Sequence, residues 1–368
     1  MTWQMWKAWH RPVWPSEVSK SPEIAQGFTF RSLWRWFAVN WPCETFEVPV
    51  ASPEHREIVI RRGTADRVFR GGIATGAMFS LVLLALIAGF LLYRGFEVFA
   101  DFGFSFLTSS TWDAGSGDAS APASFGIAAM LVGSIVTAII AMFIAVPFAI
   151  AVSLFLEYYS PSFIRKPLTA LLDLVAAIPS VIYGIWGYSI LMPKATGWAK
   201  SLNAWFDWIW IFKVPAPIFD RSPFIAGLLL ALMVLPITTA VAREVYSQAP
   251  RDQIDAAYGL GGTKWGAIRT VVMPFGRSGL VGGAMLGLGR ALGETVAVYL
   301  VLNLVFKVNF QILASAGGNV ASLIATRFGE ATPYELKALM AAGLVLFIVT
   351  LAVNATATFI VSRSREAA

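Results

Sequence analysis

An arginine and a glutamate lie inside an otherwise apolar run of the chain, residues 278–306. Arg290 follows Ser278 by 12 residues, so on a continuous helix it lies roughly 18 Å along the axis, close to the middle of a bilayer. Glu294 follows at i+4, on nearly the same face. An arginine at this depth costs at least ~2.5 kcal/mol on insertion, so both side chains should face the protein interior. The planar donors of a guanidinium fit an oxyanion such as phosphate, which predicts an anion-translocation path at Arg290 and Glu294.

Two interpretations of this pair are open on the sequence. In the structural one, Arg290 and Glu294 form a buried ion pair that locks two helices together. In the functional one, Glu294 holds Arg290 in place and keeps an arriving anion from binding too tightly to leave. Glycines recur at four-residue spacing, at positions 279, 283 and 287 and then at 289 and 293. Because small residues let helices approach closely, this pattern predicts that the span lines a subunit interface.

The residue types in this chain do not support a disulfide, a metal site or a nucleotide-binding loop. The single cysteine, Cys43, excludes an internal disulfide, and the two histidines, His10 and His55, give no metal constellation, so neither metal nor cofactor is expected. The segment from Gly259 to Lys264 resembles a phosphate-binding loop, but it has Gly-Thr-Lys where such a loop needs Gly-Lys-Ser/Thr. We therefore expect no catalytic residue in this chain, and ATP hydrolysis must come from another polypeptide.

The elements that position the arginine follow from composition. The 368 residues are 57% hydrophobic and only 14% charged, whereas a soluble domain carries about 25% charge. Too few charges are present to cover a surface in water, which predicts an all-α integral membrane protein. The net charge of +6 is dispersed rather than gathered with aromatic residues on one polar face, so nucleic acid is not an expected partner.

Six apolar runs are long enough to cross a hydrocarbon core of about 30 Å as helices. They are residues 71–93, 125–156, 168–192, 223–242, 278–306 and 338–362. Prolines at 147, 179 and 236 predict kinked helices. With a cytoplasmic N-terminus, the inner connections hold nineteen Lys and Arg residues and the outer ones six. The positive-inside rule then predicts a multi-pass protein of the cell membrane with both termini in the cytoplasm.

The rest of the chain divides by composition. Residues 1–70 hold seven of the 14 tryptophans and are predicted to be a cytoplasmic extension with little structure; a helix lying in the headgroup layer is the alternative. Residues 71–124 are predicted to form the first transmembrane helix and an outer loop, and residues 125–363 the main transmembrane domain. Residues 204–212 are apolar but too short to cross, so they should lie along the outer interface or form an external helix that contacts a partner.

The longest inner connection, residues 243–277, has signals for two short cytoplasmic helices. Pro250 suits the first turn of one helix, and the glycines between 259 and 262 can end it. Thr263 can cap a second helix that stops before Pro274.

The same loop resembles the EAA signature of ABC importer permeases, written as Glu-Ala-Ala, three residues, Gly, nine residues and Ile-x-Leu-Pro. Asp255-Ala256-Ala257 is followed after three residues by Gly261, and nine residues later by Val-x-Met and Pro274. In that family the loop forms the coupling helix, which sits in a groove of the ATP-binding subunit. The small Ala256 and Ala257 would allow a close approach, and Gly261 a turn that a side chain would block.

Three stretches resemble the PstC-type permeases of phosphate ABC importers: residues 285–298, 173–187 and 235–246. The similarity covers about residues 68–363. It implies the type I (MetI-like) importer fold and a heterodimer with a second, PstA-type permease. It also implies two ATP-binding cassette subunits inside and an external phosphate-binding protein. The intramembrane Arg and Glu of the family, implicated in phosphate passage, correspond to Arg290 and Glu294.

The predicted function is thus the transmembrane permease subunit of an ATP-driven, binding-protein-dependent phosphate importer, not an enzyme. A permease for another tetrahedral oxyanion, sulfate or molybdate, stays open because one arginine does not distinguish these ions. A rival from another class is a secondary transporter in which Glu294 carries a proton, and the EAA spacing argues against it. An intramembrane enzyme is disfavoured because the spans hold no nucleophile and base pair.

Overall fold

The computed structural model describes residues 63–115 and 123–366. The chain divides into two units, Met1–Arg70 and Gly71–Ala368, and the second contains the predicted membrane domain. The predicted tryptophan-rich extension lies outside the described residues, apart from residues 63–70.

Five helices are long and apolar enough to cross a membrane, and a bent helix pair makes six within the described residues if the pair is one span. The five are Thr64–Phe102 (α2), Ala128–Tyr159 (α4, Ala128–Leu154, with the π-helical turn η2, Phe155–Tyr159), Pro223–Ser247 (α8), Lys264–Gly293 (ending in α11, Met273–Gly293) and Pro333–Phe359 of α14 (Pro333–Glu366). The predicted spans 71–93, 125–156, 223–242 and 338–362 are therefore confirmed as helices.

The predicted span 168–192 is sharply bent, at the proline where a kink is predicted. Helix α5 (Ser162–Ala176) and the following helical segment Ser180–Phe206 meet at 92°. Pro179 caps the second segment, and a proline disfavours helix in the residue before it as well as removing a donor. By contrast, α4 and α8 continue past Pro147 and Pro236. One of the three prolines therefore breaks its span.

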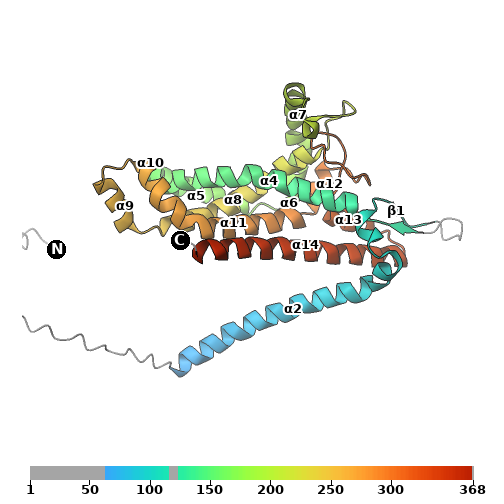
Figure 1. The fold of residues 1–368 in the computed structure, drawn as a ribbon, viewed down its shortest axis with the longest axis horizontal. Helices are drawn as coiled ribbons and strands as arrows, with labels where there is room; N and C mark the ends of the chain where they lie inside the picture. Colours follow the sequence, from blue (N-terminus) through green and yellow to red (C-terminus); the bar gives the residue numbers. More distant parts are fainter. Residues whose placement is uncertain (1–62, 116–122, 367–368) are drawn as a thin grey trace, which may run out of the picture. The chain divides into compact units, whose positions relative to one another are not determined.

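Shorter elements connect these helices. They are α3 (Ser105–Thr108), β1 (Trp112–Asp113), β2 (Ser124–Phe125), α6 (Ser180–Trp186), η3 (Gly187–Leu191), α7 (Met192–Phe206), η4 (Trp210–Phe212), α9 (Arg251–Gly259), α10 (Lys264–Ala267), η5 (Ile268–Val272), α12 (Val296–Val301) and α13 (Val320–Arg327). Strands β1 and β2 pair antiparallel, with Trp112 opposite Phe125. Figure 1 places α9 and α10 at one end of the bundle and α13 with β1 at the other.

Helix α8 packs along both α4 and α11, which lie beside it in Figure 1. Its glycine at 227 allows the close approach to α4, because a Cβ there would lie 2.5 Å from Ile140 Cγ2. The largest buried cluster joins residues of α4, α8, α11 and α12, among them Ala141, Leu229 and Val301. This packed core carries the segment that contains Arg290.

Helix α2 contacts the rest of its unit near its C-terminal end. Gly95 allows this contact, since a Cβ there would lie 2.9 Å from the Ala341 Cα of α14. Lys337 forms an ion pair with Glu97, and the Tyr334 hydroxyl donates a 2.5 Å hydrogen bond to Asp101. Before Gly95, most residues of α2 from 71 onward are exposed, so lipid or another subunit must cover them.

Candidate functional site

The fifth span is broken at the predicted site. Helix α11 ends at Gly293, Glu294 is extended with ψ 128°, and a new helix, α12, begins at Val296. The prediction that Glu294 lies one turn after Arg290 on a continuous helix is therefore wrong. Arg290 is in the last turn of α11, whereas Glu294 lies in the gap between the two helices.

Arg290 is held inside the helix bundle without an ion-pair partner among the described residues, whose two ion pairs are Arg165–Glu157 and Lys337–Glu97. Its Nε atom is buried and has no hydrogen-bond acceptor in the described structure. The hydroxyl of Tyr183 on α6 lies within electrostatic range of the guanidinium and donates its hydrogen bond to the Val175 carbonyl oxygen. A half-buried cation with a buried, unused donor can take an anionic ligand, because that ligand would supply the missing acceptor.

The side chain of Glu294 accepts a hydrogen bond at the start of α12. It is 8% exposed, and its Oε1 accepts a hydrogen bond from the backbone N–H of Ala297 at 3.4 Å. A carboxylate at this position satisfies one of the donors that a helix start leaves unpaired and is favoured by the helix dipole. The predicted ion pair with Arg290 is not formed here, so the acid lies near the arginine without neutralising it.

The predicted coupling loop, residues 243–277, forms the predicted first helix, α9, with Pro250 at its N-cap position. The turn after it depends on two glycines. Gly261 has φ +81°, a conformation that side chains rarely adopt, and a Cβ at Gly262 would lie 2.6 Å from the carbonyl oxygen of Ala257. Asp255 and Ala256 are exposed, and so is Leu260, at 91%. The loop thus presents an apolar tip and two exposed signature residues to whatever lies beside it.

The predicted second helix of this loop does not end before Pro274. Thr263 caps α10, with its Oγ1 accepting from Gly266 N at 3.1 Å, as the sequence indicates. Helix α10 then continues through the π-helical turn η5 into α11, and Pro274 occupies the first turn of α11. Pro274, which has no N–H to donate, thus lies at the junction where the π-turn passes into α11. The loop and Arg290 therefore belong to one helical run, Lys264–Gly293.

Residues 145–366 match the family model described as "Binding-protein-dependent transport system inner membrane component". The chain belongs to this family. It is thus a multi-pass membrane component of a transport system, not an enzyme.

Curated relatives cover most of the chain. The "Phosphate transport system permease protein PstC 2" of Mycobacterium tuberculosis is 38% identical over 300 residues, which is 81% of this chain and 91% of the relative. The "Phosphate transport system permease protein PstC" of Pasteurella multocida is 37% identical over 304 residues, 81% and 92% of the two chains. Among solved structures, the inward-facing MetNI methionine ABC transporter aligns with 65% of this chain and 94% of its own at 17% identity, with a TM-score of 0.45.

In this transport-system component, one part of the glycine stripe packs against another helix of the same chain, and the rest stays open, so the predicted subunit interface remains a prediction. Gly279, Gly283 and Gly287 face α8, where an added Cβ would come within 2.3 to 3.0 Å of valine side chains. Gly289 and Gly293 have no atom within 4 Å of such a Cβ. Spacing predicts a close helix approach, but it does not say which helix approaches.

Glycine-to-alanine substitutions on the two faces of α11 should have opposite effects on thermal stability. Gly287→Ala should lower the thermal unfolding midpoint, because its Cβ would meet Val234 Cγ1 at 2.5 Å and overpacking costs about 1–3 kcal/mol. Gly282→Ala on the same helix meets no atom within 4 Å, and it should raise the midpoint or leave it unchanged because alanine favours helix by up to ~1 kcal/mol. Unfolding in detergent measures both, and a shift of the same sign in both variants contradicts this packing.

Asn319 supports the helix break and was missed by sequence reasoning, although an asparagine just before an apolar run is an N-cap signal. It is 1% exposed, its Oδ1 accepts from Ser322 N at 2.7 Å to cap α13, and its Nδ2 donates to the backbone oxygen of Glu294 at 2.7 Å. The N–H of Val320 donates to Ser134 on α4. The gap after α11 is thereby tied to two other helices.

Asn319→Ala should lower stability by about 1–2 kcal/mol and reduce transport, because it removes the cap and the bond to Glu294. Asn319→Asp keeps an acceptor for the cap but places an oxygen against the Glu294 carbonyl, so it should impair transport more than stability. Thermal unfolding and uptake assays separate the two effects. Asn309→Ala is the control, since Asn309 bonds within its own loop. Equal transport loss in that control argues against a specific role.

A metal site is not supported by the described residues, which contain no group of three or more His, Cys, Asp or Glu side chains placed to hold an ion. The candidate site is therefore Arg290 with its surroundings, and the coupling loop is a candidate contact surface.

Proposed function

We propose that this chain is the permease subunit of an ATP-driven importer that carries inorganic phosphate into the cell. The observation that carries the proposal is Arg290, a half-buried cation whose Nε is a buried, unused donor, at the end of a membrane-spanning helix. The relatives named as phosphate transport permeases support phosphate as the ion. A phosphate that reaches Arg290 accepts charge-assisted hydrogen bonds from the guanidinium, which compensate for the water it loses.

Glu294 keeps this binding weak enough for transport. Its carboxylate is directed to the start of α12 and does not neutralise Arg290, so the guanidinium keeps its charge. A second negative charge nearby opposes a bound anion, which limits the residence time of phosphate at Arg290. The proposed pathway therefore passes Arg290 and Glu294 in the region where α11 gives way to α12.

The coupling loop transmits the energy. We propose that Asp255, Ala256, Ala257 and Gly261 dock into a separate ATP-binding cassette subunit, supported by the exposure of Asp255, Ala256 and Gly261 around the Leu260 tip. Movement of that subunit then acts on the helical run that ends at Arg290. From Lys264 to Arg290 the run covers 27 residues, roughly 39 Å, so the coupling loop and the anion site are mechanically connected. Pro274 marks where the run passes from π-turn to α-helix.

Further partners follow from this role. We propose a second homologous permease, of PstA type, which covers part of the exposed apolar surface, and an extracytoplasmic phosphate-binding protein that delivers the ion. The chain would lie in the cytoplasmic membrane with both termini in the cytoplasm, which the excess of Lys and Arg on the predicted inner segments supports.

Uptake of labelled phosphate into proteoliposomes tests this function. The complex with its ATP-binding and permease partners is reconstituted, and loaded binding protein is added outside. We expect uptake with ATP and none without it, and unlabelled sulfate or molybdate should not compete. Uptake that follows a proton gradient without ATP would instead support a secondary transporter, and competition by sulfate or molybdate a different oxyanion specificity.

A further inference from the structure

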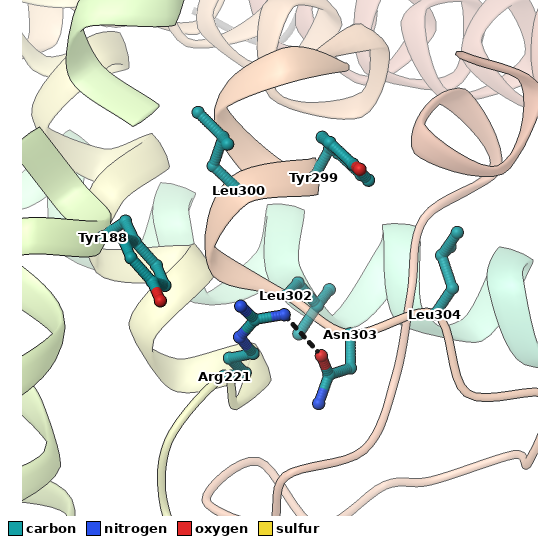
Figure 2. A pocket seen from close by; sticks show the side chains of 7 residues that line it. All are labelled: Tyr188, Arg221, Tyr299, Leu300, Leu302, Asn303 and Leu304. Carbon is teal, nitrogen blue, oxygen red and sulfur yellow. Dashed lines mark hydrogen bonds between the residues drawn. The ribbon is translucent and has the colours of Figure 1, made fainter. Parts of the chain in front are cut away.

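A second arginine lines a cavity at the outer end of the bundle. The cavity, of about 280 Å³, opens between η3, the loop that precedes α8 and the segment after α12, as Figure 2 shows. It is lined by Tyr188, Arg221, Tyr299, Leu300, Leu302, Asn303 and Leu304. Helix α8 starts beside Arg221 and ends at Ser247, shortly before α9, so the cavity and the coupling loop lie at opposite ends. The lining holds one cation and no carboxylate.

Arg221 is fixed in an unusual conformation. Its φ is +50°, which non-glycine residues adopt rarely and which persists where surrounding contacts maintain it. Its Nη1 donates a 2.9 Å hydrogen bond to Asn303 Oδ1, and the guanidinium carbon lies 5.5 Å from the centre of the Tyr188 ring. Figure 2 shows the guanidinium between these two side chains. Neither of the ion pairs among the described residues involves Arg221, so its charge is not compensated by a bound carboxylate.

Donors remain available around this charge. One guanidinium N–H is used on Asn303, which leaves the others, and Asn303 accepts through Oδ1, which leaves its Nδ2 amide. Asp220, the preceding residue, lines a separate cavity of about 610 Å³ together with Lys307, and Asn303 borders both cavities. Asp220, the acidic residue nearest to Arg221 in the sequence, thus lines the neighbouring cavity, which is also lined by the cation of Lys307.

Two packed segments connect this cavity with the region of Arg290. The first runs from Tyr183, which interacts with Arg290, to Tyr188, five residues or roughly 7 Å further along. The second runs from Glu294 through α12 to Asn303. They lie against each other, because a Cβ at Gly184 would be 3.0 Å from the Ala297 Cα. The cavity and Arg290 therefore lie at different positions along the same pair of packed segments.

We propose that this cavity is an outer oxyanion-binding site, where Arg221 and Asn303 hold a phosphate ion before it passes to Arg290. The identity of the ion rests on the proposed function. The guanidinium provides charge and paired donors, and the Asn303 amide and the Tyr188 and Tyr299 hydroxyls provide further neutral donors. The strained backbone at Arg221 fits such a role, because it fixes the guanidinium at the cavity before the ion arrives.

Protection of an introduced thiol from a maleimide reagent tests the site without requiring transport. Cys43 is the chain's one cysteine, so Cys43→Ser with Leu304→Cys gives a single thiol on the cavity wall. In the complex purified with its partners, inorganic phosphate should slow labelling of this thiol. Arg221→Gln should raise the phosphate concentration needed for equal protection by about tenfold or more, as expected for losing charge-assisted hydrogen bonds. Lys307→Gln is the matched control and should leave protection unchanged.

Several results would overturn the site. They are absence of protection with Arg221 intact, equal protection after Arg221→Gln, or an equal loss in the Lys307→Gln control. A changed labelling rate without phosphate, combined with unchanged protection, would identify Arg221 as a purely structural link. If the proposed function is wrong but the outer site is real, the complex will not transport phosphate, yet phosphate will still protect the thiol in a way that depends on Arg221. The Arg290→Ala complex should behave in the same way. Intact uptake without protection rejects the outer site alone.

Discussion

Replacing Arg290 with alanine should abolish phosphate uptake while leaving the complex assembled. The loss follows from removing the charge-assisted hydrogen bonds to the passing ion; two such bonds at about 1.5 kcal/mol each correspond to roughly 100-fold in rate. Stability should hold or rise, because the variant removes a buried donor that has no acceptor and breaks no ion pair among the described residues. Uptake into proteoliposomes and thermal unfolding measure the two effects. Arg290→Lys, which keeps the charge but loses the planar donor pair, should retain part of the activity.

The structural interpretation of this arginine predicts the reverse. If Arg290 and Glu294 locked two helices as a buried ion pair, Arg290→Ala would cost about 3–5 kcal/mol of stability, because an uncompensated carboxylate would be left behind. Arg327→Ala is the matched control, since Arg327 is an exposed arginine at the end of the short helix α13. Normal uptake by Arg290→Ala, or a large loss of stability with uptake reduced only in proportion, would reject the anion path.

Gly261→Val should uncouple ATP hydrolysis from transport. The backbone at Gly261 has φ +81°, where a side chain costs about 1–2 kcal/mol and a β-branched one is worse. Gly262→Ala should have a similar effect through a different contact, the 2.6 Å approach of its Cβ to the Ala257 carbonyl oxygen. Strain of this size shifts a docking equilibrium by roughly tenfold. Transport-linked ATPase activity should therefore fall, although the chain still inserts in the membrane.

A glycine in the same turn supplies the control. Gly259 ends α9 and does not have a positive φ, and a Cβ there would meet no atom within 4 Å. The Gly259→Ala variant should therefore transport normally. Co-purification of the ATP-binding subunit distinguishes lost docking from a docked but inactive loop. Wild-type ATPase stimulation in both Gly261→Val and Gly262→Ala would show that this turn does not couple the two subunits.

Sequence patterns predicted the features that depend on local chemistry. The apolar runs located the straight spans because their length alone distinguishes them from soluble helices. Thr263 caps its helix as expected, Pro250 lies one position before the first turn in which it was predicted, and the turn residue Gly261 has the left-handed backbone that only glycine adopts easily. These properties reside in a few neighbouring residues, so a single sequence is enough to indicate them.

The features that sequence did not reveal depend on distant residues. No proline or glycine pair forces the chain to leave the helix at Glu294; Asn319, 25 positions away, stabilises the break through the Glu294 carbonyl. The glycine spacing gave the close approach of α11 but not its partner helix, because periodicity describes one helix alone. Arg221 appeared as one more basic residue of an outer loop, since nothing local announces a positive φ or a cavity.

The uninterrupted helical run that reaches Arg290 sets the scale of any motion between the two membrane faces. A rod of roughly 39 Å that tilts by about 10° at one end displaces the other by about 7 Å, more than the width of a guanidinium group. The π-turn Ile268–Val272 lies within this rod, between the loop and Arg290. A small rotation at the loop is therefore enough to change which groups surround the cation.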